Sequence, residues 1–392
     1  MKRVYLDHNA TTPLDQRVFD AMQPYLVEHY GNPSSPHCYG RLAKEALEES
    51  RAKIANAIKA RPEEIIFTSG GTEADNLALW GIVLNAQRKK GHIITSSIEH
   101  HAVLRTCNAL ERDGYRITYL PVDNQGRVNP DDVKASIRKD TILISVMLAN
   151  NETGVVEPVG EIGSIAREHD IPFHCDAVQA VGKRPIDVNS LCTDLLSISS
   201  HKLYGPKGIG ALYVKEGILL TPLMTGGHHE RALRAGTENV AGIVGFAHAL
   251  EFSIDEMDIY SSRISSLRDR FETALLKRIN FSTIHSAQAE RLPHCSSVGF
   301  SSVEAESILL HLDLKGIAVS SGSACTTGEA EPSHVLTAMG VSPEIAQGTI
   351  RISLGKGNTE EEINYTLDVL EHAIGSLRSI SSQWQAGEKK AL

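Results

Sequence analysis

Short apolar segments alternate with amphipathic segments from about residue 15 to residue 260. The apolar segments cover residues 63–69, 92–97, 116–122, 141–150, 171–178, 194–200 and 208–214. The segments between them, such as 72–87 and 100–114, have helical patterns. Strands that are apolar along their whole length are buried on both faces, so the pattern predicts a parallel sheet covered by helices on both sides. The predicted fold is α/β with three layers.

The last third of the chain has a different pattern. A long helical region at about 240–280 is followed by predicted strands at 296–302, 316–322 and 349–355. Thr359 and Glu362 form a capping box for a final helix with one apolar face. The residues of that face are Ile363, Leu367, Leu370, Ile374 and Leu377. We expect a large α/β domain (15–260), a smaller α+β domain (1–14 and 261–384) and a disordered polar tail (385–392).

Charge and composition restrict the functional classes. The 392-residue chain has a formal net charge of −9, which argues against nucleic acid or an anionic membrane as a partner. No apolar run approaches the roughly 18 residues of a membrane span, and the first residues lack the apolar stretch of a signal peptide. Six scattered cysteines without a C-x-x-C pair predict neither a disulfide framework nor a zinc site. We expect a cytoplasmic protein.

Polar residues that follow the predicted strands should meet at one edge of the sheet, where ligands bind in open α/β folds. Gly70 and Gly71 open a helix after 63–69, as in many phosphate sites, although this is also a common turn. His100, Asn151, Asp176, Gln179 and Lys202 follow other strands. A metal on His174 and Asp176, or on His228, His229 and Glu230, is a weaker alternative because the helical H-E-x-x-H spacing is absent.

The combination of these residues favours pyridoxal 5'-phosphate. This cofactor requires a lysine for covalent attachment, an acid on its pyridine nitrogen and a phosphate site. Lys202, Asp176 and the helix start after Gly70 would supply them. We therefore expect a pyridoxal-phosphate enzyme without a catalytic metal.

A separate feature is the segment SSGSACTTGEAEPS at residues 320–333. Its one thiol, Cys325, lies among small and polar residues, whereas a structural cysteine normally lies among aliphatic ones. The composition predicts an exposed and reactive cysteine on a flexible loop.

The chain strongly resembles the cysteine desulfurases of the NifS/IscS type, which are fold-type-I pyridoxal-phosphate enzymes. The resemblance rests on YLDHNATTP, FTSGGTEADN, NNETG, HCDAVQAVGK, SSHKLYGPKGIGALYV, RAGTEN, SSGSACT and TIRISLG, and it runs from residue 4 to about 378. It implies that Lys202 holds the cofactor, that Cys325 is the nucleophile and that His100 is an acid/base over the ring. Asp176 and Gln179 would contact the ring, and Asn151 and Arg351 the substrate carboxylate. Further cofactor contacts would be Gly71, Thr72, Asn151, Ser199, Ser200 and His201.

The resemblance also implies a reaction and partners. L-cysteine would give L-alanine and a persulfide on Cys325, which passes its sulfur to an acceptor such as an iron–sulfur scaffold protein. Thr237 would reach the cofactor of the partner subunit in a homodimer. The alternatives are a selenocysteine lyase or aminotransferase on the same scaffold, an inactive scaffold for an iron–sulfur assembly partner, and a metal hydrolase built on His228, His229 and Glu230.

Overall fold

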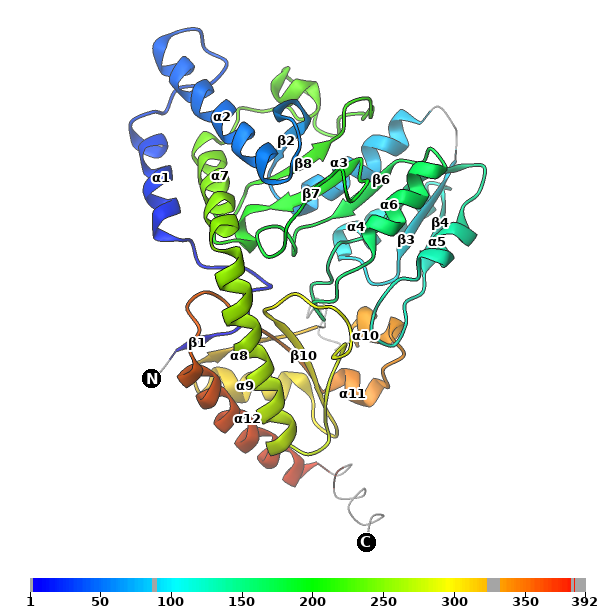
Figure 1. Ribbon diagram of the computed structural model, residues 1–392, viewed down its shortest axis with the longest axis vertical. Helices are drawn as coiled ribbons and strands as arrows, with labels where there is room; N and C mark the ends of the chain where they lie inside the picture. Colours follow the sequence, from blue (N-terminus) through cyan, green and yellow to red (C-terminus); the bar gives the residue numbers. More distant parts are fainter. Residues whose placement is uncertain (1–2, 87–89, 323–331, 382–383, 385–392) are drawn as a thin grey trace.

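A large mixed sheet lies at the centre of the upper part of the molecule in Figure 1. The structure is a computed structural model that describes residues 3–86, 90–322, 332–381 and 384. In spatial order, the strands of this seven-stranded sheet are β2 (Ile65–Thr68), β8 (Gly210–Val214), β7 (Leu195–Ser199), β6 (Phe173–Asp176), β5 (Thr141–Ser145), β3 (His92–Ser96) and β4 (Arg116–Leu120). The predicted α/β fold with a mainly parallel sheet is confirmed.

One strand departs from the predicted parallel arrangement. Strand β8 runs antiparallel to both of its neighbours, β2 and β7. Only the short helix η2 (Ser200–Lys202) and a turn separate Ser199, which ends β7, from Gly210, which begins β8. A parallel crossover needs about a dozen residues or more, usually with a helix, so this short connection returns antiparallel. The parallel prediction was therefore wrong for residues 208–214.

Helices cover both faces of the sheet. Adjacent strand residues alternate between two cores: Ile66 packs with Leu77 on one face, and Ile65 packs with Ile54 on the other. Helices α3 (Gly71–Asn85) and α4 (His101–Arg112) cover the first face. The other face is covered by α2 (Cys38–Ala57), α5 (Pro130–Ser136), α6 (Val159–Glu168) and α7 (Val240–Asp255), and α1 (Gln16–Val27) packs on α7. The arrangement has the three predicted layers.

A second, smaller sheet lies in the lower part of Figure 1. Its antiparallel strands, in spatial order, are β12 (Ser320–Ser321), β13 (Thr349–Ser353), β10 (Cys295–Phe300) and β9 (Ser282–Ile284). The helices around it are α8 (Met257–Arg278), α9 (Ala305–Asp313), α10 (His334–Ala338), α11 (Pro343–Gln347) and α12 (Glu360–Ile380). Helix α12 has the predicted capping box, and its apolar face packs into a core separate from that of the large sheet.

The N-terminal segment belongs to this smaller core. Strand β1 (Val4–Tyr5) pairs in parallel with β11 (Ile317–Ala318), and Val4 and Leu6 are buried against it. Asp7 then forms an isolated bridge with Ser353. We propose that residues 1–14 and 261–384 form the small domain and residues 15–260 the large one. No helix in the described ranges is long and apolar enough to cross a membrane.

Candidate active site

A cavity of about 370 Å³ opens at the carboxyl ends of the parallel strands, next to the small sheet. Its lining residues are Asn9, Ala10, Gly71, Thr72, Asp75, His100, Met147, Asn151, Asp176, Val178, Gln179, Ser199, His201, Lys202 and Arg351. Ten of these residues had been singled out from the sequence. A larger depression of about 870 Å³, lined by residues such as Arg138 and His169, holds none of them.

Lys202 lies at the end of η2, where the chain turns from β7 towards β8. Its Nζ donates to the carbonyl oxygens of Asn9, at 2.5 Å, and Ala10, at 2.8 Å. Desolvation, followed by the charge of Arg351, lowers the pKa of Lys202 to about 8, while Asp7 and Asp176 oppose this shift. A sizeable fraction of the amine is therefore neutral, and nucleophilic, near pH 7–8.

Asp176 ends β6 and faces the same cavity, with only 6% of its surface exposed. Its Oδ1 accepts from the Val178 N–H at 2.9 Å. Burial raises the pKa of Asp176 to about 6, and the Val178 N–H and Lys202 limit that rise. Burial, and then the charge of Asp176, raise the pKa of Asp75 well above its ordinary value. Of these two carboxyls, Asp176 is the one that carries the negative charge at neutral pH.

Two histidines approach the cavity from different elements. His100 caps α4, and its Nδ1 accepts from the Ala102 N–H at 3.1 Å, so the neutral ring carries its proton on Nε2. The ring is open to the cavity. Desolvation by the surrounding protein, and then the charge of Lys202, lower its pKa to about 4. The Nδ1 of His201 lies 3.1 Å from the Thr11 hydroxyl, and burial lowers its pKa to about 4. Both rings are neutral at physiological pH.

The start of α3 forms one wall of the cavity. Gly70 is its N-cap with φ +153°, and no side chain among the described residues caps the helix. A Cβ on Gly71 would lie 2.7 Å from a Val178 methyl group, so only glycine lets the start of α3 pack this closely against Val178. Uncapped N–H groups at the N-terminus of a 15-residue helix favour an anion.

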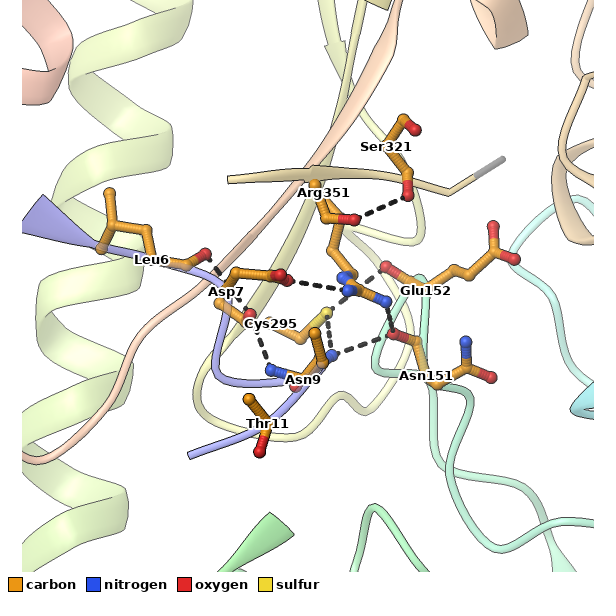
Figure 2. A network of polar contacts seen from close by, with 12 residues as sticks. Leu6, Asp7, Asn9, Thr11, Asn151, Glu152, Cys295, Ser321 and Arg351 are labelled. Atoms are coloured by element: carbon orange, nitrogen blue, oxygen red, sulfur yellow. Dashed lines mark hydrogen bonds and ion pairs between the residues drawn. The ribbon is translucent and has the colours of Figure 1, made fainter. Parts of the chain in front are cut away.

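Arg351 extends from β13 to the cavity and is 8% exposed (Figure 2). Its Nη2 lies 2.8 Å from Asp7 Oδ1, and its Nη1 donates to the Asn151 carbonyl at 3.1 Å. Its Nε is buried without a hydrogen-bond partner among the residues that the structure describes. The contacts with Asp7 and Asn151 use two of the five N–H donors of the guanidinium.

Two residues that the resemblance assigns to the site do not line this cavity. Ser200 is fully buried, and a Cβ on Gly205 would lie 2.0 Å from its hydroxyl oxygen. Thr237 is exposed. Cys325 lies outside the described residues, in the segment between Gly322 and Pro332.

The family model "Aminotransferase class-V" matches residues 4–366. The chain belongs to this family. Within the class-V family, it is 54% identical to a cysteine desulfurase IscS of Dictyoglomus turgidum, over 99% of this chain and 100% of the relative. It is 50% identical to a cysteine desulfurase IscS of Methanosarcina thermophila, over 97% and 94% of the two chains.

Solved structures agree with this placement in the class-V family. A NifS-like protein, 39% identical, covers 95% of this chain and 100% of its own, with a TM-score of 0.90. A structure described as SspA in complex with cysteine, also 39% identical, covers 90% and 98%, with a TM-score of 0.81. The resemblance to NifS/IscS-type cysteine desulfurases and the fold-type-I architecture are confirmed, and the chain is an enzyme of this type.

The N-terminal segment was not predicted to be part of this class-V site. Asn9 and Ala10 line the cavity, and Asp7 holds Arg351. The motif YLDHNATTP contains all three but is not preceded by a strand of the large sheet, so the strand-end argument did not reach it. Asp75 was also missed, because only the structure shows that this carboxyl lies among the buried, mostly apolar residues of α3.

The proposed metal ligand Glu230 has a structural role. Its carboxylate accepts from Arg51 at 2.7 and 2.9 Å and from the Phe67 N–H at 2.7 Å, and both charged side chains are at least 95% buried. We expect Glu230→Ala to lower the free energy of unfolding by about 3–5 kcal/mol, because a buried guanidinium loses its partner. Urea denaturation measures this loss. If a chelator destabilises the wild type equally, Glu230 is a metal ligand instead.

Proposed function

We propose that this class-V enzyme is a pyridoxal-phosphate-dependent cysteine desulfurase. It would convert L-cysteine and the thiol of Cys325 into L-alanine and a Cys325 persulfide. The observation that carries the proposal is the convergence of Lys202, Asp176, Arg351 and the uncapped start of α3 on one cavity.

The residues of the cavity fit the cofactor. The start of α3 at Gly71 and Thr72, with Ser199 and His201, would hold the phosphate, since this wall has uncapped N–H groups. Asp176, which keeps its charge beside neutral Asp75, suits a protonated ring nitrogen. When bound, the cofactor would withdraw electrons from the substrate's Cα.

The substrate carboxylate would bind at Arg351. Arg351 and the neighbouring Asn151 both line the cavity, and their side chains would donate to the carboxylate. A substrate held there would have its Cα near Lys202. Lys202, with its lowered pKa, would move the Cα proton as a neutral amine. His100 would donate a hydrogen bond from Nε2 at the cavity wall.

Cys325 would attack the substrate sulfur as a thiolate and retain that sulfur. The segment that contains Cys325 follows β12, in which Ser320 pairs with Arg351. The chain therefore leaves the small sheet beside the residue that we assign to the substrate carboxylate.

We further propose a cytoplasmic homodimer that gives its sulfur to an acceptor protein, such as an iron–sulfur scaffold. Exposed apolar side chains support the dimer: Leu26, Val27, Tyr30, Tyr39 and Leu42 lie on or between α1 and α2. Burying such a group removes apolar surface from water. Thr237 is exposed and does not line the cavity of its own subunit. It would contact the cofactor of the partner subunit.

A product assay tests the proposed function. Protein loaded with pyridoxal 5'-phosphate should convert L-cysteine to equal amounts of L-alanine and protein-bound sulfane sulfur, in a single turnover without reductant. The Cys325→Ala variant should bind the cofactor normally but retain no sulfur. Formation of a keto acid would indicate an aminotransferase, and wild-type alanine and sulfide formation by Cys325→Ala would exclude Cys325 as the nucleophile.

A further inference from the structure

Asn9 is almost completely buried, with 1% of its surface exposed, and each of its polar groups has a partner; Figure 2 shows its side chain beside Asn151 and Cys295. Its Nδ2 donates to the Asn151 carbonyl at 3.0 Å and lies 3.2 Å from Cys295 Sγ. Its Oδ1 lies 2.5 Å from His294 Nε2. Its backbone N–H donates to Ser353 Oγ at 2.9 Å.

These contacts fix the orientation of the amide. A backbone carbonyl can only accept, so the nitrogen of the Asn9 side chain must face Asn151. Its oxygen then faces His294, which must carry its proton on Nε2. Burial lowers the pKa of His294 well below its ordinary value, so the ring is neutral. The Asn9 side chain therefore has one hydrogen-bonded orientation.

The main chain of the same residue reaches the catalytic lysine. The Asn9 carbonyl accepts from Lys202 Nζ at 2.5 Å and from Gln179 Nε2 at 3.0 Å. Asn9 thus links three residues assigned to cofactor or substrate, namely Lys202, Gln179 and Asn151. Its other partners, His294, Cys295 and Ser353, lie in the small sheet or immediately before it.

We propose that Asn9 is a positioning residue of the desulfurase reaction: its side chain fixes a backbone carbonyl that receives the Lys202 amine and fixes the Asn151 main chain next to Arg351. This inference rests on the proposed function. An N–H···O bond to a carbonyl favours the ammonium form. The Asn9 carbonyl therefore limits the fall of the Lys202 pKa that desolvation produces. A displaced carbonyl should lower that pKa further and misalign the site for the substrate carboxylate.

Asn358 provides a matched control. It is 4% exposed, its Nδ2 donates to the Tyr5 carbonyl at 3.1 Å, and its Oδ1 accepts from the Gly355 N–H at 2.7 Å. Asn358 therefore fixes the same N-terminal segment but does not line the cavity. Replacing Asn358 should lower the free energy of unfolding but leave the pKa of Lys202 unchanged.

The experiment compares Asn9→Ala, the milder Asn9→Ser and Asn358→Ala with the wild type. Cofactor-free protein is mixed with pyridoxal 5'-phosphate between pH 6 and 10, and the rate of covalent capture is followed by absorbance. Capture requires a neutral lysine, so the rate rises with pH through the pKa of Lys202. We expect this apparent pKa to fall by about half a unit or more in both Asn9 variants and to stay unchanged in Asn358→Ala.

With L-cysteine, kcat/KM should fall about tenfold or more in Asn9→Ala, and less than about twofold in Asn358→Ala. The proposal is overturned if the capture pKa of a folded Asn9 variant matches that of the wild type, or if Asn358→Ala shows the same changes. Cofactor capture needs no L-cysteine, so it tests the role of Asn9 independently of the desulfurase activity. If the wild type fails to release sulfur from L-cysteine, only the proposed function is contradicted.

Discussion

Replacement of Lys202 by alanine is expected to lower the rate of L-alanine formation from L-cysteine at least about 10⁴-fold, at the upper end of the effect of one acid/base group. The residue has two roles in the proposed reaction: it holds the cofactor and it moves the Cα proton. Its amine is already oriented by the Asn9 and Ala10 carbonyls. Single-turnover alanine formation, measured at saturating cofactor, gives the effect.

Two controls sharpen this test. Lys207 is exposed, lies five residues further on and does not line the cavity, so Lys207→Ala should retain the wild-type rate. A small amine such as methylamine should restore part of the activity of Lys202→Ala, because it can replace the missing base. A Lys202→Ala variant that keeps more than about a tenth of the wild-type rate would show that another group moves the proton.

We expect Arg351→Ala to raise the KM for L-cysteine about a hundredfold or more. Truncating one partner of a buried, hydrogen-bonded charge pair costs about 2–5 kcal/mol, and here the substrate carboxylate would lose its main partner. Asp7 would also be left without the guanidinium at 2.8 Å. Arg351→Lys should recover only part of this loss, because an ammonium cannot bind a carboxylate in the bidentate manner.

Arg378 is the control for the stability effect of removing a buried arginine. It is 6% exposed and donates to the carbonyls of Ser301, Asn280 and Phe281 in the small domain, away from the cavity. Arg378→Ala should lower the melting temperature but leave the KM unchanged. An equal rise in KM for both variants would show that Arg351 acts through stability and not through the carboxylate.

The central part of the site could be predicted from the sequence because it follows a general rule of α/β folds. Asp176 ends β6, and Lys202 lies three residues after the end of β7; these two apolar strands are neighbours in the sheet. The direction of β8 was missed because strand patterns carry no information on direction. The short connection from Ser199 to Gly210 contained that information.

The N-terminal contribution could not be predicted in the same way. Asn9 reaches the cavity, and Asp7 reaches Arg351, because β1 pairs with β11 and because Asp7 bridges to Ser353, more than 300 residues away. Such pairing depends on tertiary packing, and no local pattern of polar and apolar residues encodes it. Burial of Asp75 also depends on how α3 packs on the sheet.

The closure of the site by both ends of the chain has a consequence for its synthesis on the ribosome. Asp7 and Asn9 emerge 344 residues before their respective partners Arg351 and Ser353. Domains generally fold in order from the N-terminus as the chain is made. The nascent chain can therefore form the large sheet, with Lys202 in place, well before the carboxylate site exists. The cysteine-binding cavity is complete only when the small domain has folded and paired with the segment that contains Asp7 and Asn9. A chain that is still being made therefore cannot remove sulfur from cysteine.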